Sequence, residues 1–252
     1  MKGAVVRIAG MQKLTLLDYP GLTAATVFTP GCNLRCPFCH NSQLIAGETE
    51  ETFDDSDDVL AFLRTRHRLL DGVCISGGEP LLQPGIDAFC RSLKELGFSV
   101  KLDTNGTQPD RLRALLDEGL VDYVAMDVKN APERYAETTG RAELDLAPIT
   151  ESMRLLLSQD PAAGGATYEF RTTVVRELHA REDLTQLAYW IVDEARTLLS
   201  PLCPPWHIQN FKDTETVLAG PGALHPWDED ELRALLPHLR AIIPTVELRG
   251  ID

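Results

Sequence analysis

The order of apolar patterns along the chain is the feature that most restricts its fold. Short runs rich in β-branched residues alternate with segments of helical spacing, about six times between residues 22 and 212. This alternation predicts parallel strands joined by right-handed crossovers, in a sheet that closes fully or partly like a barrel. We therefore expect an α/β fold, a single-domain partial (β/α)6 barrel with parallel strands. The domain would span residues 1–252, with a core over about 22–212 and a loop, a helix and a short strand over 213–252.

The individual elements can be placed from their periodicity and their flanking residues. The expected strands are 24–29, 72–76, 98–103, 121–126, 168–175 and 207–211. The expected helices are 56–70, 86–96, 109–118, 149–158, 183–199 and 228–243. In such folds the chemistry lies at the C-terminal ends of the strands, where the loops converge.

Four polar or glycine-rich signatures follow the first four expected strands. They are the cysteine loop GCNLRCPFCHN (31–41), SGGEP (76–80), DTNG (103–106) and MDVK (126–129). Alone, a G-G-E-P or an Asp after a strand is an ordinary turn, and a lysine there is an ordinary surface residue. Four such segments at strand ends are predicted to share one rim, which favours a functional site.

The cysteine loop holds three of the six cysteines, at the spacing C-x3-C-x2-C. Cys36 to Cys39 matches a thioredoxin-like C-x-x-C, which leaves Cys32 unexplained, and His40 completes the C-x-x-C-H of haem attachment. Zinc could take three thiolates and His40, although His40 directly follows Cys39 and would crowd a tetrahedral ion. An iron–sulfur cubane also takes thiolate ligands, and three of them leave one of four irons open. The local pattern does not choose among these centres.

Composition and charge exclude some classes of function. The net charge of −14 disfavours binding to nucleic acid phosphates. The sequence shows neither a secretory signal nor an apolar run of membrane-spanning length, so we expect a cytoplasmic protein without structural disulfides. Cys74, Cys90 and Cys203 are interpreted as buried, inert thiols, and the acidic run 48–58 as a solvated loop and helix start.

The motif C-x3-C-x2-C with Phe38 before its last cysteine resembles the cluster motif of radical S-adenosylmethionine (SAM) enzymes, and the later rim motifs agree. LLDYPG (16–21), CHN (39–41), DTNG and DVK resemble more specifically the activating enzymes of glycyl radical enzymes, above all those of anaerobic ribonucleoside-triphosphate reductase. The resemblance covers residues from about 5 to 212. It implies one [4Fe–4S] cluster held by Cys32, Cys36 and Cys39, with SAM bound at the open iron.

The resemblance also implies the remaining site residues. The residues that would contact the cofactor are Phe38, His40, Asn41, Gly77, Gly78, Glu79, Asp103, Thr104, Asp127, Lys129, Arg171 and His207. Asp103, Thr104 and Asp127 could also hold a monovalent or divalent cation beside the carboxylate of SAM. Asp18 would contribute to docking of the protein substrate.

The implied activity is reductive cleavage of SAM to a 5′-deoxyadenosyl radical that abstracts hydrogen from a glycine of a partner enzyme. The expected partner is anaerobic ribonucleoside-triphosphate reductase, with a flavodoxin- or ferredoxin-like electron donor. Pyruvate formate-lyase or another glycyl radical enzyme is the alternative partner. A radical SAM enzyme acting on a small molecule, such as a carboxylic-ring synthase of the queuosine pathway, and a non-catalytic metal-binding module are the alternatives of another class.

Overall fold

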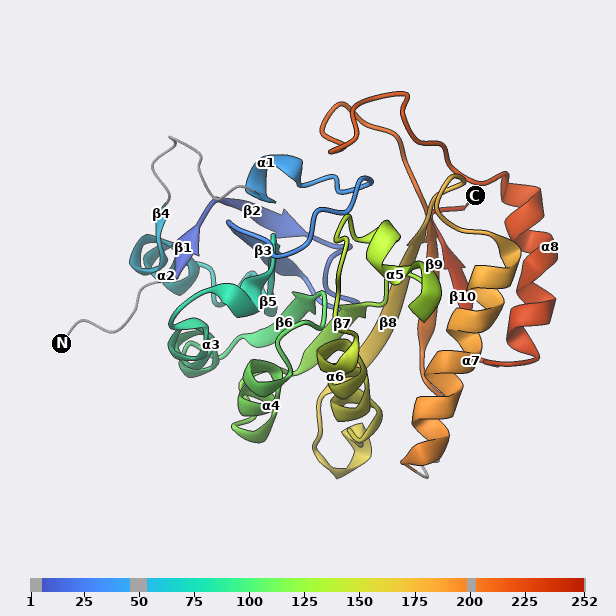
Figure 1. Cartoon of the computed structure of the whole chain (residues 1–252). Coiled ribbons are helices and arrows are strands. Elements are labelled where there is room, and N and C mark those ends of the chain that lie inside the picture. The colour runs from blue at the N-terminus through green and yellow to red at the C-terminus, as the bar shows by residue number, and fades with distance from the viewer. Residues whose placement is uncertain (1–5, 46–53, 199–202, 252) are drawn as a thin grey trace. The chain divides into compact units, whose positions relative to one another are not determined.

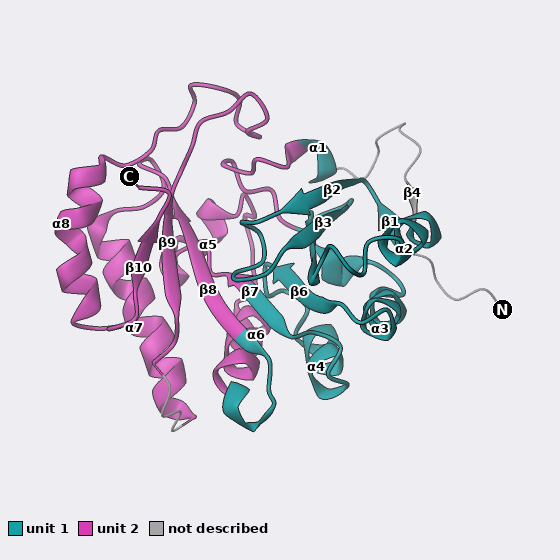
Figure 2. Cartoon of the chain, turned by 180° about the vertical axis from the view of Figure 1, so that it is seen from behind, with its two compact units in different colours: residues 1–33, 43–125, 160–167 teal, residues 34–42, 126–159, 168–252 magenta. Residues whose placement is uncertain are grey.

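The computed structural model describes residues 6–45, 54–198 and 203–251, and its elements are labelled in Figure 1. Residue contacts divide the chain into two compact units, which are coloured separately in Figure 2. The first unit comprises residues 1–33, 43–125 and 160–167, and the second comprises residues 34–42, 126–159 and 168–252. The expectation of one domain over residues 1–252 stays a prediction.

The first unit is built on parallel strands with one antiparallel edge strand. Its elements are β1 (Arg7–Ile8), β2 (Gly10–Thr15), β3 (Ala24–Thr29), β4 (Asp54–Asp55), α2 (Ser56–Arg64), β5 (Gly72–Gly77), α3 (Ile86–Glu95), β6 (Ser99–Thr104) and α4 (Pro109–Asp117). Strand β3 pairs in parallel with β5, and β5 with β6, whereas β2 pairs with β3 in the antiparallel direction. β3 and β5 are buried along most of their length, as expected for parallel strands covered on both faces.

The second unit continues the same alternation. Its elements are α5 (Pro132–Thr138), α6 (Ala147–Leu157), β8 (Thr167–Val174), α7 (Arg181–Thr197), β9 (Trp206–Asn210), α8 (Glu229–Arg240) and β10 (Glu247–Arg249). Strands β8, β9 and β10 are parallel neighbours. The short helix α1 (Ser42–Ile45) and strand β7 (Tyr123–Asp127) each contain residues of both units, and β8 begins with one residue of the first unit, Thr167.

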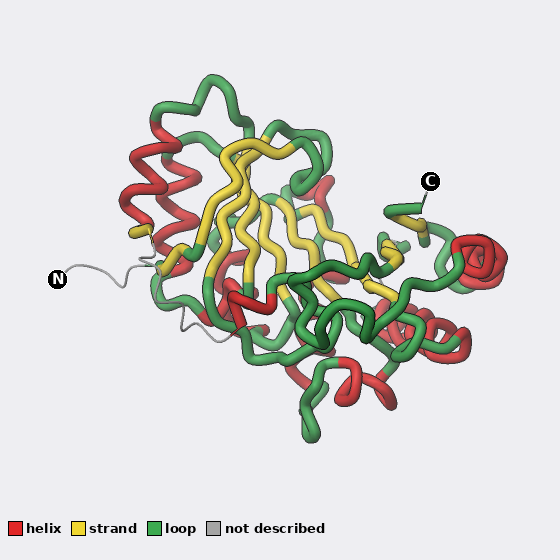
Figure 3. The backbone as a smooth tube through the Cα atoms, turned by 90° about the horizontal axis from the view of Figure 1, so that it is seen from above, coloured by secondary structure: helices red, strands yellow, loops and turns green. Residues whose placement is uncertain are grey.

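From β5 to β9 each strand is followed by one or two helices before the next strand, as the sequence predicts, and loops connect these elements (Figure 3). The six expected strands and the six expected helices are all present, with ends shifted by up to six residues. The mostly parallel α/β fold is therefore confirmed. No helix among the described residues is long and apolar enough to cross a membrane.

Three expectations about elements need correction or qualification. The sequence does not predict the antiparallel strand β2, which lies at an edge where three of its side chains are exposed and so show no clear apolar pattern. The thiol of Cys203 is exposed rather than buried, because it lies on an irregular segment before two prolines. Most of the acidic run 48–58 lies outside the described residues, and its described end begins α2.

Candidate functional site

Cys32 lies in the first unit, on the loop that follows β3. Its backbone N–H donates to the carbonyl of Ile45 at 3.3 Å, which fixes the start of the cysteine loop against α1. The side-chain amide of Asn105, just after β6, lies 3.8 Å from the Cys32 sulfur and donates to Asn33 Oδ1 at 3.0 Å. Amide donors beside cluster sulfurs help to set the properties of an iron–sulfur centre. Asn105 belongs to the predicted DTNG segment but is not among the residues predicted to contact the cofactor, because an Asn after a strand is also an ordinary turn residue.

The two glycines that follow the core of β5 let the backbone approach the segment before Cys32. The N–H of Gly78 donates to the carbonyl of Thr29 at 2.8 Å. A Cβ atom on Gly77 would lie 2.3 Å from Thr29 N, and one on Gly78 would lie 2.0 Å from the carbonyl oxygen of Gly31. Gly77 also has a φ of 119°, which side chains rarely adopt. Backbone packing therefore requires both predicted glycines.

Glu79 has a carboxylate that points into the first unit. The residue is fully buried, at 0% exposure. Its oxygens accept hydrogen bonds from Thr104 Oγ1 at 2.8 Å, Asn105 N at 2.7 Å and Leu81 N at 3.1 Å. The carboxylate thus ties the end of β5 to the end of β6. The structure brings Glu79 and Thr104 together, but their side chains bind each other.

Asp103 lies on the opposite face of β6 from Thr104, because neighbouring side chains on a strand alternate. Its Oδ1 forms an ion pair with Lys101, and its Oδ2 accepts a hydrogen bond from Ser76 Oγ at 3.0 Å. The side-chain oxygens of Asp103 and Thr104 therefore do not converge on one point. The structure does not support a cation held jointly by these two side chains.

Cys36 and Cys39 lie in the second unit, on one tight turn. The N–H of Cys39 donates to the carbonyl of Cys36 at 3.0 Å. Burial raises the pKa of the Cys39 thiol, while the backbone N–H of Asn41 and the charge of Lys129 act in the opposite direction. A bound metal would favour the thiolate further.

Residues of the segment that follows β9 form hydrogen bonds with this turn. Leu218 N donates to the carbonyl of Cys39 at 3.0 Å, and Ala219 N donates to the carbonyl of Pro37 at 2.9 Å. His40 Nε2 forms a hydrogen bond of 2.6 Å with the carbonyl of Lys212, and the His40 ring lies 5.4 Å from that of Phe211. The predicted site residue His40 is therefore engaged by the chain's C-terminal part. The sequence predicts no such contact, because an irregular loop carries no periodic signal.

Asp127 joins two cations at the end of β7. Its Oδ1 accepts from Arg171 Nε at 2.9 Å, and its Oδ2 pairs with Lys129 Nζ at 2.8 Å. Burial alone would raise the pKa of the Asp127 carboxyl, but Arg171 and Lys129 hold this pKa well below its usual range. Burial likewise would lower the pKa of Lys129, and Asp127 raises it instead. The structure thus brings together three predicted residues as a network with one net positive charge.

Phe38 connects this network to the cysteine turn. Lys129 Nζ lies 5.9 Å from the centroid of the Phe38 ring, within reach of a cation–π interaction. The ring of His179, which is 2% exposed, meets Phe38 edge-on with centroids 6.4 Å apart. His179 Nε2 also hydrogen-bonds the carbonyl of Lys129 at 2.9 Å. The sequence carries no signal for His179, which acts through backbone contacts and belongs to no motif.

His207 lies beside Arg171 in register, on the neighbouring strand. Its Nε2 is 3.4 Å from Glu169 Oε2, and Glu169 in turn pairs with Arg249 at 2.7 Å. Burial, followed by the charge of Arg249, lowers the pKa of His207. His207 therefore belongs to a buried network that links β8, β9 and β10.

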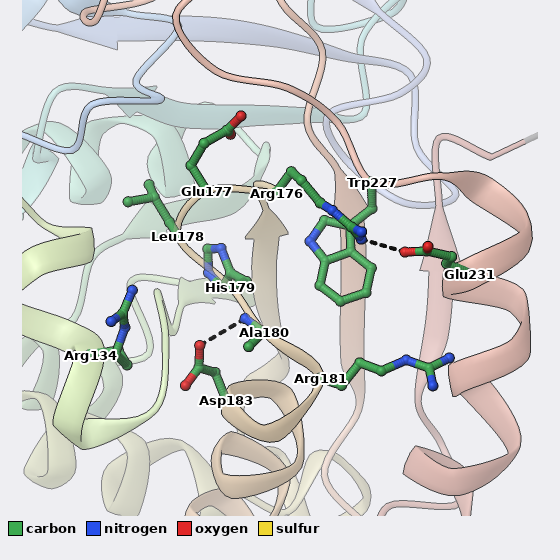
Figure 4. Close-up of a pocket in the computed structure, with 10 residues that line it drawn as sticks. All are labelled: Arg134, Arg176, Glu177, Leu178, His179, Ala180, Arg181, Asp183, Trp227 and Glu231. Carbon is green, nitrogen blue, oxygen red and sulfur yellow. Dashed lines mark hydrogen bonds and ion pairs between the residues drawn. The ribbon is translucent and has the colours of Figure 1, made fainter.

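A pocket of about 700 Å³ opens beside the start of α7 (Figure 4). Arg176 pairs with Glu231 across it and lies 5.0 Å from the Trp227 ring, while Asp183 accepts a hydrogen bond from Ala180 N at 2.8 Å. His179 lines the pocket too, and its ring also meets the Phe38 ring edge-on. Several of the charged lining groups thus already have protein partners.

The donor set fits an iron–sulfur cluster. Cys32, Cys36 and Cys39 form no disulfide in the described part of the chain, and a cubane cluster takes thiolates. The Asn105 amide lies beside Cys32, and the charge of Lys129 acts on both Cys36 and Cys39. These groups favour the thiolate forms and a cofactor of negative charge.

Comparison with known proteins gives the family context. The model of the Radical SAM superfamily matches residues 26–159. A protein of Methanocaldococcus jannaschii with the provisional name glycyl-radical enzyme activating enzyme is 33% identical over 97% of this chain and 96% of its own length. The pyruvate formate-lyase-activating enzyme of Clostridium pasteurianum is 34% identical over 54% of this chain and 58% of its own. This chain thus matches little more than half of that enzyme.

Two further likenesses bear on the fold and on the alternatives. The 7-carboxy-7-deazaguanine synthase of Hyperthermus butylicus is 30% identical over 74% of this chain and 72% of its own. The crystal structure of Streptococcus suis SuiB bound to S-adenosylmethionine has a TM-score of 0.63 at 16% identity, over 87% of this chain and 48% of that chain. The latter similarity concerns the fold alone, over about half of SuiB.

Proposed function

The chain belongs to the radical SAM superfamily and, within it, to the glycyl-radical enzyme activating enzymes, and from this premise we propose that it activates an anaerobic ribonucleoside-triphosphate reductase. The observation that carries the proposal is the similarity to an activating relative over nearly the whole of both chains. The LLDYPG, CHN, DTNG and DVK segments support this particular partner class.

Cys32, Cys36 and Cys39 would hold the [4Fe–4S] cluster. With SAM bound, such a cluster supplies the one-electron reductive cleavage that yields the 5′-deoxyadenosyl radical, which takes hydrogen from a glycine of the partner. We propose that a flavodoxin- or ferredoxin-like protein supplies the electron. The chain's own contribution is to position the reactants and to keep water away.

The Asp127 network would orient the cofactor in the second unit. Its net positive charge suits the carboxylate of SAM, and the Asp127–Lys129 ion pair limits the rotation of both side chains. Phe38 covers Lys129 and so lowers the access of water to that ammonium. Arg171 and His207 would extend the same surface along β8 and β9.

Exposed leucines in the first unit support a macromolecular substrate. Leu16 and Leu17 are 71% and 89% exposed, and they directly precede Asp18. Asp18 itself accepts a hydrogen bond of 2.5 Å from Thr26, so it fixes the turn that presents the leucines. We propose that this turn docks the partner, with the leucines as the contact and Asp18 as their support.

Anaerobic reconstitution with iron and sulfide tests the activity directly. With dithionite and SAM, the holoprotein should release 5′-deoxyadenosine and methionine, and electron paramagnetic resonance should show a glycyl radical doublet on the reductase. Parallel reactions with pyruvate formate-lyase distinguish the two partner classes. A doublet on pyruvate formate-lyase alone would reassign the partner, and no 5′-deoxyadenosine from a cluster-loaded protein would refute the enzyme activity.

A small-molecule activity is the second candidate, favoured by the 30% identity to a 7-carboxy-7-deazaguanine synthase. It predicts 5′-deoxyadenosine release that depends on a small-molecule substrate and not on a partner protein. Mass spectrometry of the reaction products, with 7-carboxy-7-deazaguanine as the reference compound, separates the two activities. Zinc as the only metal after reconstitution would instead indicate a non-catalytic module.

A further inference from the structure

Lys101 is a charged side chain in the interior of the first unit. It lies in the middle of β6, is 2% exposed, and pairs in register with Cys74 of β5. Its Nζ lies 3.8 Å from the Cys74 sulfur and 5.8 Å from the centroid of the Tyr123 ring. A buried ammonium is costly unless an opposite charge compensates it. The role of Lys101 therefore depends on the carboxylate that it meets.

That carboxylate belongs to Asp103, two residues further along the same face of β6. Lys101 Nζ pairs with Asp103 Oδ1, and Ser76 Oγ donates to Oδ2 at 3.0 Å. The Asp103 side chain is 17% exposed, so it lies at the border between the interior and solvent. Both of its oxygens thus meet donors from the chain, and its charge is balanced inside the unit.

A metal cation at Asp103 would have to displace or share these donors. An added cation at Oδ1 would lie next to the ammonium and be repelled by it. Thr104, the expected second ligand, is turned to the other face, where its hydroxyl donates to Glu79 at 2.8 Å. The first unit therefore has the ammonium of Lys101 at the position where the resemblance leads us to expect a bound metal cation.

We propose that the ammonium of Lys101 takes the place of a metal cation at Asp103, so that this chain binds SAM without an added cation. The inference rests on the proposed function for the placement of Asp103 beside the cofactor. A lysine ammonium carries a single, compact positive charge, as a bound potassium ion does. The ammonium also has three hydrogen-bond donors. Because β6 carries this charge, it is present before the cofactor arrives.

The first test uses the protein without cluster or SAM. Thermal unfolding is measured in potassium chloride, sodium chloride and choline chloride at equal ionic strength. It is also compared between a sample with magnesium chloride and a sample with a chelator. The wild-type Tm should be the same in potassium and in choline. In the Lys101→Met variant, the Asp103 carboxylate loses its ammonium partner and can bind potassium instead. The Tm of this variant should therefore rise by about 3–6 °C when the potassium concentration is ten times the Kd of the variant for potassium.

Matched variants show whether the effect belongs to this site. Lys94 pairs with Asp122 at 2.6 Å in the same unit, so Lys94→Met removes an ammonium from another carboxylate and should create no potassium dependence. The double variant Lys101→Met/Asp103→Asn should lose the dependence again. A saturable rise of the wild-type Tm with any of the metal ions would overturn the proposal, and this measurement needs no variant to fold.

The second test measures SAM affinity after cluster reconstitution, by equilibrium dialysis in the same salts. Wild-type Kd values should agree within about twofold, while Lys101→Met should bind about tenfold more weakly in choline and recover in potassium. Wild-type affinity that requires potassium would refute the inference but not the proposed function. Absence of a cluster would refute the proposed function, and the unfolding test of the unloaded protein would still decide the role of Lys101.

Discussion

His179 is held in one protonation state by its neighbours. Val175 N donates to Nδ1 at 3.1 Å, so Nδ1 carries a lone pair and Nε2 donates to the Lys129 carbonyl. Burial lowers the pKa of His179, and the charges of Asp183 and Arg134 act on it in opposite directions. The neutral ring therefore holds the Lys129 backbone and the Phe38 ring in place.

The first prediction concerns the pH dependence of stability. Because the pKa of His179 is lowered in the folded protein, the unfolded chain binds more protons once the pH falls below about 6.5. The free energy of unfolding should therefore decrease as the pH falls from about 6.5, the pKa of His179 in the unfolded chain, to the lower pKa of His179 in the folded protein. The decrease should be about 1.4 kcal/mol for each pH unit between these two pKa values. His179→Gln keeps an acceptor and a donor without titrating, and urea unfolding between pH 5 and 7.5 should show a shallower decrease. His207, whose pKa burial also lowers, contributes to the decrease that remains. An unchanged slope in the variant would show that His179 already binds a proton when folded.

The second prediction separates ligand thiols from inert ones. Cys36→Ser should reduce bound iron after reconstitution to near background while the protein stays folded and unfolds cooperatively, because Cys36, although only 7% exposed, lies on a loop outside the strands and helices. Cys90 is fully buried in α3, and burial raises its pKa to about 12. Cys90→Ser should therefore lower the free energy of unfolding by about 1–3 kcal/mol and leave the iron content unchanged. Equal iron loss in both variants would contradict the assignment of Cys36 as a ligand.

At the scale of elements, the ends of β3 and β5 lie in close contact, and this contact positions the site residues of the first unit. Gly78 N and Glu79 N donate to the carbonyls of Thr29 and Gly31, both at 2.8 Å. This pairing continues the parallel ladder of β3 and β5 beyond the strands and fixes the backbone just before Cys32. The G-G-E-P segment thus supports the cysteine loop through backbone hydrogen bonds.

The third prediction tests this contact. In Gly78→Ala the new Cβ would lie 2.0 Å from the Gly31 carbonyl, so the two backbones must separate. We expect a loss of about 1–3 kcal/mol in the free energy of unfolding and a lower iron content after reconstitution. Gly10→Ala is the matched control, because nothing lies within 4 Å of its Cβ. Equal unfolding midpoints in urea for the two variants would show that the loop adjusts without cost.

The elements that can be predicted from the sequence are those whose packing imposes a period. β3 is predicted at its observed ends, because buried β-branched runs between turn residues have few other solutions. Lys101 shows why part of the site could not be predicted. A lysine in a strand pattern normally faces solvent, and only the register with Cys74 and the pairing with Asp103 reveal its burial. His179 and the contacts of the 212–219 segment depend likewise on tertiary neighbours that no local pattern encodes.

At the scale of the whole molecule, the proposed function requires two separable abilities, cleavage of SAM and recognition of a protein. The first depends on the cysteines and the strand-end residues, and the second on an exposed surface. Leu14, Leu16 and Leu17 are three of the exposed large apolar residues among the described part of the chain, and they are close in sequence. Scattered exposed leucines are common, whereas a group beside a fixed turn is typical of contact surfaces.

The fourth prediction is that Leu17→Glu separates the two abilities. Leu17 is 89% exposed, and Thr15 Oγ1 accepts a hydrogen bond of 3.2 Å from its N–H, so the turn should persist in the variant. The free energy of unfolding should change by no more than about 0.5 kcal/mol, and 5′-deoxyadenosine release without partner should be unchanged. The yield of glycyl radical on the partner, measured by electron paramagnetic resonance at limiting enzyme, should fall about tenfold if the contact contributes about 1.4 kcal/mol.

Leu69→Glu is the matched control for this prediction. It changes a leucine that is 66% exposed elsewhere in the same unit and should leave the radical yield unchanged. Equal radical yields in the two variants would place the partner on another surface, because a charge in the centre of an apolar contact cannot be solvated once the partner covers it.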